Sequence, residues 1–72
     1  MIPELDLHGV RYEDVARKCD RFMTEIWGRC DEAKIITGNS IVMRKHVESA
    51  LCSYDVDLKP LHHNPGILRI FF

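Results

Sequence analysis

The sequence predicts an α/β (α+β) two-layer sandwich, in which a four-stranded mixed sheet carries two helices on one face. The apolar residues alternate with the period of a strand, then of a helix, in the order β-α-β-α-β-β. The 72 residues have room for one small domain, residues 1–72. A helix that joins two strands normally makes them parallel with a right-handed crossover, so the first three strands should run the same way and the fourth should return antiparallel.

The first strand is predicted over Glu4–His8, because leucines alternate there with an acid and a base. Leu5 and Leu7 would face the core, while Asp6 and His8 would share the open face. The Asp6 carboxylate would then lie close enough to orient the imidazole of His8, and imidazole is the side-chain group most commonly used for proton transfer. The pattern therefore indicates an acid–base pair, although two polar residues on a solvated sheet face would produce the same alternation.

The first helix is predicted over Tyr12–Arg29, with Gly28 near the point where it frays. Glu13 and Asp14 fall in its first turn, where a negative charge is favourable at the positive helix end. The residues at helical spacing are Val15, Cys19, Phe22 and Ile26.

The second strand is predicted over Ala33–Thr37, and Gly38 ends it. Asn39 or Ser40 would cap the second helix, because both side chains accept hydrogen bonds from unpaired helical N–H groups. Its apolar positions are Met43, Val47, Leu51 and Tyr54. A strand–glycine–helix turn exposes amides that attract phosphate, although a helix cap alone would look the same. The spacing of a Walker loop is absent.

The third strand is predicted over Val56–Lys59, and Pro60 should end it or lie on a sheet edge. Asn64–Gly66 is typical of a turn, and Ile67–Phe72 is a β-rich last strand. For the sheet, we prefer an order in which the first strand is central, beside the second and third.

The formal net charge is −1, whereas nucleic-acid binders usually carry a basic excess, so a nucleic-acid site would need a local basic patch. Such a patch is available, because the loops after the first three strands should gather at the carboxyl edge of the sheet. The basic side chains near that edge are Arg11, Arg44, Lys45, His46, His62 and His63. A solvated helix face would explain the same charges.

His62 and His63 are adjacent and could join His8 or Asp6 around a divalent ion, although a zinc-finger spacing is absent. We assign no metal ligands. The only cofactor that we consider is Mg²⁺ or another divalent cation, bound transiently.

The three cysteines are odd in number and form no C-x-x-C pair, which favours reduced thiols in a cytoplasmic protein over a structural disulfide. No segment approaches the length of a membrane span, and no N-terminal segment has the pattern of a signal peptide. We therefore expect no membrane partner.

The run Leu5–Gly9, followed at a distance by Ile35–Gly38 before a second helix, resembles the small MutS-related (Smr) domain. Asn64–Gly66 before a last strand is similar to the closing turn of that family. The resemblance covers about residues 4–72. It implies a fold similar to the C-terminal domain of a bacterial translation initiation factor. It also implies nucleic-acid binding and, in several members, nicking or cleavage of DNA or RNA.

By this resemblance, Asp6 and His8 fall on the family's acid and histidine, and Thr37 and Gly38 fall on its Thr-Gly-x-Gly loop. The chain departs from the family at Ser40, which stands where the second glycine of that loop would be.

We therefore expect a DNA- or RNA-binding domain with endonuclease activity at Asp6 and His8. The expected phosphate contacts are Gly9, Arg11, Thr37, Gly38, Asn39, Ser40, Arg44, Lys45, His62, His63, Asn64 and Gly66. One alternative is a binding module without catalysis. Another is a protein-interaction domain that pairs through the edge of its last strand, near Ile70 to Phe72. We favour a monomer, with a protein partner supplying its targeting.

Overall fold

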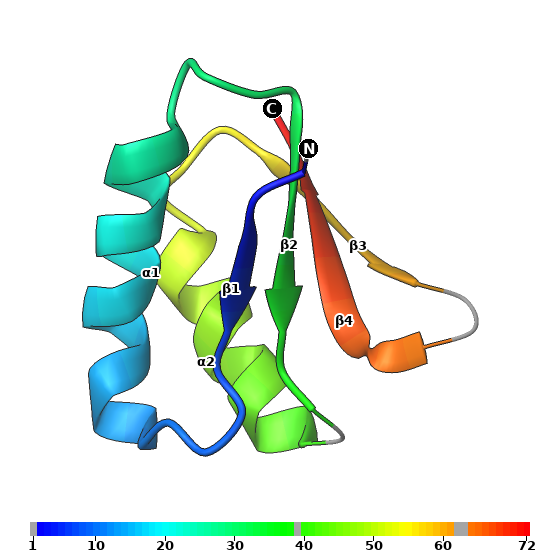
Figure 1. Cartoon of the computed structure of the whole chain (residues 1–72). Coiled ribbons are helices and arrows are strands. Elements are labelled where there is room, and N and C mark those ends of the chain that lie inside the picture. Colours follow the sequence, from blue (N-terminus) through cyan, green and yellow to red (C-terminus); the bar gives the residue numbers. More distant parts are fainter. Residues whose placement is uncertain (1, 39, 62–63) are drawn as a thin grey trace.

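A computed structural model describes residues 2–38, 40–61 and 64–72 of the chain. Its elements, in chain order, are β1 (Glu4–Asp6), α1 (Tyr12–Ile26), β2 (Glu32–Ile36), α2 (Ile41–Leu51), β3 (Asp57–Leu61) and β4 (Asn64–Phe71). The four strands form one sheet, and both helices cover the same face of it (Figure 1). The predicted two-layer architecture and element order are confirmed.

The strands lie in the order β1-β2-β4-β3. β1 is parallel to β2, and β4 is antiparallel to both β2 and β3, so the first three strands run in the same direction as predicted. The preferred order, with the first strand central, is wrong: β1 lies at one edge of the sheet and pairs with β2, and β4 separates β2 from β3. β4 is the longest strand and pairs on both sides, whereas Pro60 lacks an N–H group and keeps β3 at an edge.

The position of β4 also overturns the suggestion that a partner pairs with its edge. Ile70 pairs with Ala33 of β2 and with Leu58 of β3, so β4 has no free edge at that residue. The edge strands of the sheet are β1 and β3 instead.

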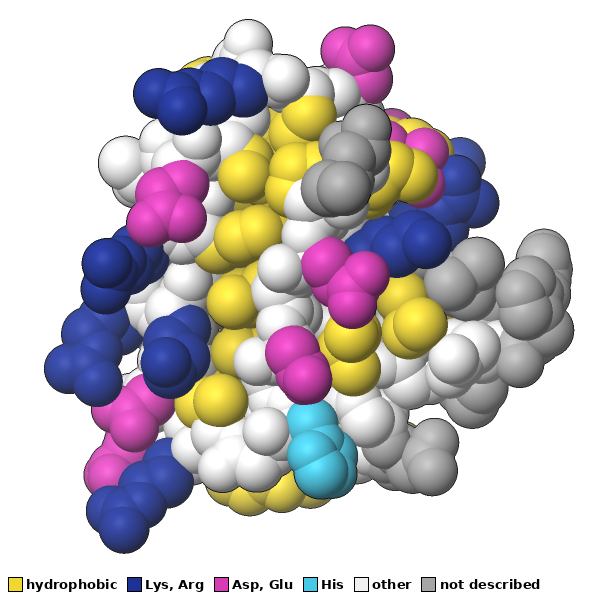
Figure 2. All heavy atoms as spheres, in the orientation of Figure 1, with side chains coloured by type: hydrophobic (Ala, Val, Ile, Leu, Met, Phe, Trp, Pro, Cys, Tyr) yellow, Lys and Arg dark blue, Asp and Glu magenta, His cyan; other side chains and the backbone are white. Residues whose placement is uncertain are grey.

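The core lies between the sheet and the helices. Alternate strand residues point toward the helices, and those of β2 and β4 are Ala33, Ile35, Leu68 and Ile70. The helices bury Val15, Cys19, Phe22, Met23, Ile26, Met43, Val47 and Leu51 against them. Full burial of one such large aliphatic side chain stabilises the fold by about 1.5–3 kcal/mol. Figure 2 shows hydrophobic side chains continuing into the seam between α1 and β1, with Lys and Arg outside it along α1.

Several element ends differ from the predictions. α1 ends at Ile26 rather than Arg29, because the chain leaves the helix at Trp27 and Gly28 takes a φ of +77°. The predicted turn Asn64–Gly66 is the first part of β4. β3 runs to Leu61, past the predicted end at Lys59, and Pro60 lies inside this edge strand, one of the two places predicted for it. None of the helices within the described part of the chain is long and apolar enough to span a membrane.

Candidate functional site

His8 lies in a tight turn just after β1 rather than inside the strand. The Leu7 N–H donates to the carbonyl of Ile36 at 2.9 Å, and the Val10 N–H then donates back to the carbonyl of Leu7 at 3.0 Å. Gly9 has a φ of +81°, which suits the third position of such a turn. Leu7 is buried, whereas the side chain of His8 is exposed. The turn therefore presents the imidazole at the carboxyl end of β1.

Asp6 acts on the backbone of this turn. Its carboxylate accepts a hydrogen bond from the backbone N–H of His8 at 2.9 Å. The sequence predicted that the carboxylate would orient the imidazole. The hydrogen bond instead goes to the main chain, because the strand ends at Asp6 and the chain turns before the two side chains can share a face.

The loop after β2 is joined to the start of β4. The N–H groups of Thr37 and Gly38 both donate to the carbonyl of Gly66, at 2.7 and 3.2 Å, and the Thr37 hydroxyl donates to the same oxygen at 3.2 Å. The Gly66 N–H donates to Oδ1 of Asn64 at 3.1 Å. A Cβ atom at Gly66 would lie 2.9 Å from the backbone oxygen of Gly38, so only glycine fits at this crossing. These bonds fix the Thr37–Gly38 backbone.

The turn after β1 and the loop after β2 meet around a hollow of about 520 Å³. The His8 ring lies beside the Gly38 backbone, since a Cβ atom at Gly38 would be 3.7 Å from Cδ2 of the imidazole. Gly38 also has a φ of +67°, which disfavours any other residue. The remaining lining residues are Leu7, Gly9, Val10, Arg11, Tyr12, Thr37, Ser40 and Met43.

Both helices begin at the same end of the sheet (Figure 1), and Tyr12 at the start of α1 and Ser40 at the cap of α2 both line the hollow. The Ser40 hydroxyl accepts from the Met43 N–H at 3.0 Å, which confirms the predicted cap of α2. The first turn of α1 carries two acids that offset the positive end of the helix, and the first turn of α2 carries none. The start of α2 therefore leaves an uncompensated positive potential at the rim of the hollow.

The predicted basic side chains are distributed unevenly. Arg11 lines the hollow with 81% of its side chain exposed, and its guanidinium lies 3.5 Å from Glu13. Arg44 and Lys45 are not among the lining residues. Arg44 extends along α2, where Nε lies 3.6 Å from the Glu48 carboxylate, and Lys45 borders a separate, shallower hollow with His46. Of the other predicted contacts, Asn39, His62 and His63 lie outside the described residues.

Tyr12 is the site residue that the sequence prediction missed. Its ring stacks on that of His46, with centroids 4.9 Å apart and planes 12° apart. Its hydroxyl lies 3.3 Å from Oγ of Ser40, and the residue is 47% exposed. The sequence predicted that Tyr12 begins the first helix. Its place directly after Arg11, at the edge where the loops gather, was the signal that pointed to the site.

The described side chains form no cluster of metal ligands. Within residues 2–38, 40–61 and 64–72, no three His, Cys, Asp or Glu side chains lie close enough to hold an ion together. A Mg²⁺ ion at Asp6 would therefore take most of its ligands from water and phosphate, as Mg²⁺ commonly does.

The three cysteines are free, as predicted. Cys19 is buried in the core, and this burial, with a smaller contribution from the Asp20 carboxylate, raises the pKa of its thiol from 9.0 to about 11. Cys19 is thus a packing residue rather than a nucleophile.

Comparisons of the chain with models of protein families, with curated proteins and with solved structures found no match in any of the three. The resemblance to the Smr domain therefore rests on the motifs Leu5–Gly9, Ile35–Gly38 and Asn64–Gly66 themselves.

Proposed function

We propose that this domain binds DNA or RNA at the hollow beside His8 and cleaves a phosphodiester bond there. One observation carries the proposal: the exposed imidazole of His8 lies beside Gly38 in a hollow lined by the first residues of both helices. Histidine is the side chain best suited to proton transfer near neutral pH, and a helix N-terminus attracts phosphate. The hollow thus combines a proton carrier with an anion site.

The phosphate contact falls on the start of α2. The amides of Thr37 and Gly38 already donate to Gly66, so they are not free for a ligand. The amides of Ile41 and Val42 stand in the first helical turn, where no carbonyl one turn earlier can accept from them. Arg11, which lines the same hollow, would add a charge-assisted contact to the phosphate.

His8 would act as a general base or acid in the cleavage step. As a base, it would take a proton from a water molecule while the water oxygen bonds to phosphorus and the bond from phosphorus to the leaving oxygen breaks. As an acid, it would give a proton to that leaving oxygen. Asp6 is a positioning residue, because it holds the turn through the His8 backbone.

We also propose the cellular compartment and the oligomeric state of the protein. Three free cysteines fit a reducing compartment such as the cytoplasm. We propose a monomer there, with a protein partner supplying its targeting.

The test is an electrophoretic assay with labelled single- and double-stranded DNA and RNA, with Mg²⁺ or a chelator. We expect His8→Ala to slow cleavage by roughly 10²- to 10⁴-fold, the usual contribution of a general acid or base. Arg29→Ala, an exposed change at the far end of the molecule, is the matched control and should cleave at the wild-type rate. Cleavage by His8→Ala at the wild-type rate would refute the catalytic assignment.

A binding module without catalysis is the second candidate. The observation in its favour is the Asp6 carboxylate, which holds the backbone of the turn rather than the imidazole, so His8 lacks the expected partner. This candidate predicts a shifted band without cleavage, with affinity that falls steeply as salt rises. Binding that does not depend on salt would contradict it.

A further inference from the structure

The Tyr12 ring is held in a fixed position at the rim of the hollow. The ring of His46 in α2 stacks nearly parallel on one of its faces, with the two ring centroids 4.9 Å apart. The Tyr12 hydroxyl, 3.3 Å from Oγ of Ser40, reaches the cap of α2. The ring is therefore ordered by two contacts from α2, yet 47% of the residue stays exposed. A side chain ordered in advance loses little conformational entropy when a ligand arrives.

The rest of the ring belongs to the hollow that holds His8. Because His46 occupies one face, the part that lines the hollow is the opposite face or the edge. Leu7, Val10 and Met43 contribute apolar side chains to the same lining. A phosphate alone makes no use of an aromatic ring and an apolar lining, whereas a flat heterocyclic base does.

We propose that Tyr12, supported by His46, stacks one unpaired nucleobase next to the phosphodiester that lies at His8. This inference rests on the proposed function and narrows its substrate to single-stranded or looped DNA or RNA. In a duplex the bases are stacked on one another, so a base reaches the Tyr12 ring only after it leaves the helix, at a cost of a few kcal/mol. Single strands expose the faces of their bases at no such cost.

The test measures binding by fluorescence anisotropy with a single-stranded oligonucleotide, the same strand with one abasic nucleotide, and the duplex. The abasic nucleotide is moved along the strand to find the position that matters. Stacking of one base on an aromatic side chain contributes about 1–3 kcal/mol, so Tyr12→Leu should weaken binding of the intact single strand by about 5- to 150-fold. The loss on the duplex should be much smaller.

The controls separate stacking from folding. Tyr12→Phe keeps the ring and should stay within about twofold of the wild type. Trp27→Leu removes an aromatic side chain of similar exposure at the other end of the molecule and should not change binding. The abasic strand tests the same contact without altering the protein. At the critical position, the wild type should lose as much affinity from the missing base as Tyr12→Leu loses on the intact strand.

The outcomes distinguish this inference from the proposed function. If the wild type binds none of the oligonucleotides, the proposed function fails and the inference fails with it. If the wild type binds but Tyr12→Leu binds the intact single strand equally well, the inference alone is overturned. It is also overturned if Tyr12→Leu weakens single-strand and duplex binding equally, or if no abasic position reduces wild-type affinity.

Discussion

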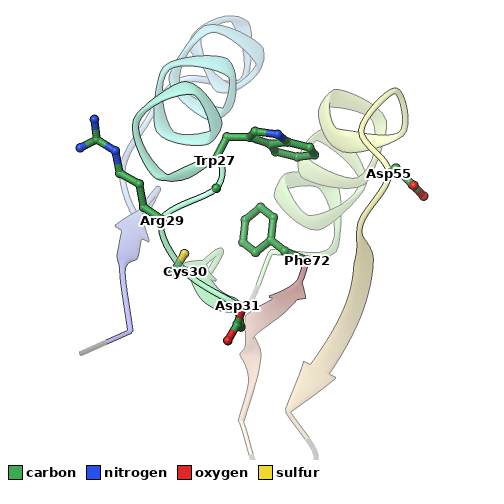
Figure 3. A pocket seen from close by; sticks show the side chains of 7 residues that line it. Trp27, Arg29, Cys30, Asp31, Asp55 and Phe72 are labelled. Carbon is green, nitrogen blue, oxygen red and sulfur yellow. The ribbon is translucent and has the colours of Figure 1, made fainter.

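The two ends of the sheet are closed in different ways. At the His8 end, backbone hydrogen bonds and glycines hold the loops, and the side chains of His8, Arg11 and Tyr12 remain exposed. At the opposite end, side chains close the fold (Figure 3). The Trp27 ring contacts Phe72 edge-on, with centroids 5.6 Å apart, and meets Tyr54 at 5.9 Å.

The charged side chains at the Trp27 end do not point toward a common site. This end also has a hollow, of about 470 Å³, but Arg29, Asp31 and Asp55 around it point away from the aromatic rings (Figure 3). Its aromatic rings are engaged with one another and join the end of α1 to the end of β4. An end held by its main chain leaves side chains available for a ligand, whereas an end held by side chains uses them for stability.

The largest effect on stability is expected at Gly66. In Gly66→Ala, the new Cβ atom would lie 2.9 Å from the Gly38 oxygen and 3.1 Å from its carbonyl carbon, so the backbone must move, at a cost of about 3 kcal/mol. The matched change at the other end, Gly28→Ala, meets nothing within 4 Å and bears only the strain of a φ of +77°, about 1 kcal/mol. Urea unfolding of both variants measures the difference. Equal losses would show that the Gly66–Gly38 crossing is not tight.

Trp27→Ala tests whether the far end serves stability alone. The residue is 50% exposed, so about half of a large aromatic surface is lost from the interior, and the free energy of unfolding should fall by about 2–3 kcal/mol. Thermal unfolding gives the loss, and oligonucleotide binding at a temperature where the variant is folded should match the wild type. A folded Trp27→Ala that no longer binds nucleic acid would contradict the division of roles.

The elements of the fold could be predicted from the sequence, whereas their order in the sheet could not. Helix and strand periodicity predicted both helices and all four strands, because the spacing of apolar residues shows which side of an element is buried. Examples are Val15, Cys19 and Phe22 in α1, and Ala33 and Ile35 in β2. The sheet order did not follow from periodicity. It depends on β4 pairing on both sides, a long-range choice that no local pattern records.

For the candidate site, sequence placed the residues better than it placed their contacts. The loops at His8 and Gly38 meet as expected, because parallel strands end at one edge. The role of Gly66 was not visible, since its close approach to Gly38 joins residues that lie far apart in the chain. The predicted partner of Asp6 was wrong, because β1 ends at Asp6, two residues before the predicted end at His8, and the carboxylate therefore accepts from the main chain rather than orienting the imidazole.

Alkaline pH should weaken the fold through Cys19, a core residue in the middle of α1. In the folded state the thiol of Cys19, with its pKa raised to about 11 by burial, keeps its proton, whereas the unfolded chain loses it near pH 9. The folded state therefore binds more protons between these values, and the stability falls as pH rises, by roughly 2 kcal/mol from this group. The hydrogen bond to Asp20 also raises the pKa of Tyr54 above its ordinary value of about 10, which adds a loss in the same direction as the pH rises past that value.

Urea unfolding between pH 8 and pH 11 measures this loss. Cys19→Ala should reduce the pH dependence, and adding Tyr54→Phe should reduce it further. An unchanged slope in Cys19→Ala would show that the thiol ionises as easily in the folded protein as in the unfolded chain.

The smallest effect is expected at the cap of α2, which belongs to the His8 end. Ser40→Ala removes the oxygen that accepts from the Met43 N–H at 3.0 Å, and the loss of such a cap costs about 1 kcal/mol. The same substitution nine residues later, Ser49→Ala, lies on the exposed surface of α2 and should stabilise the helix by a few tenths of a kcal/mol, because alanine favours the helix interior. Ser40→Asn should restore most of the stability, since asparagine caps well.

Because Ser40 Oγ also lies 3.3 Å from the Tyr12 hydroxyl, Ser40→Ala should weaken single-strand binding at most as much as Tyr12→Leu does. A larger loss of binding would show that the start of α2, where we place the phosphate, contributes more to binding than the aromatic ring does.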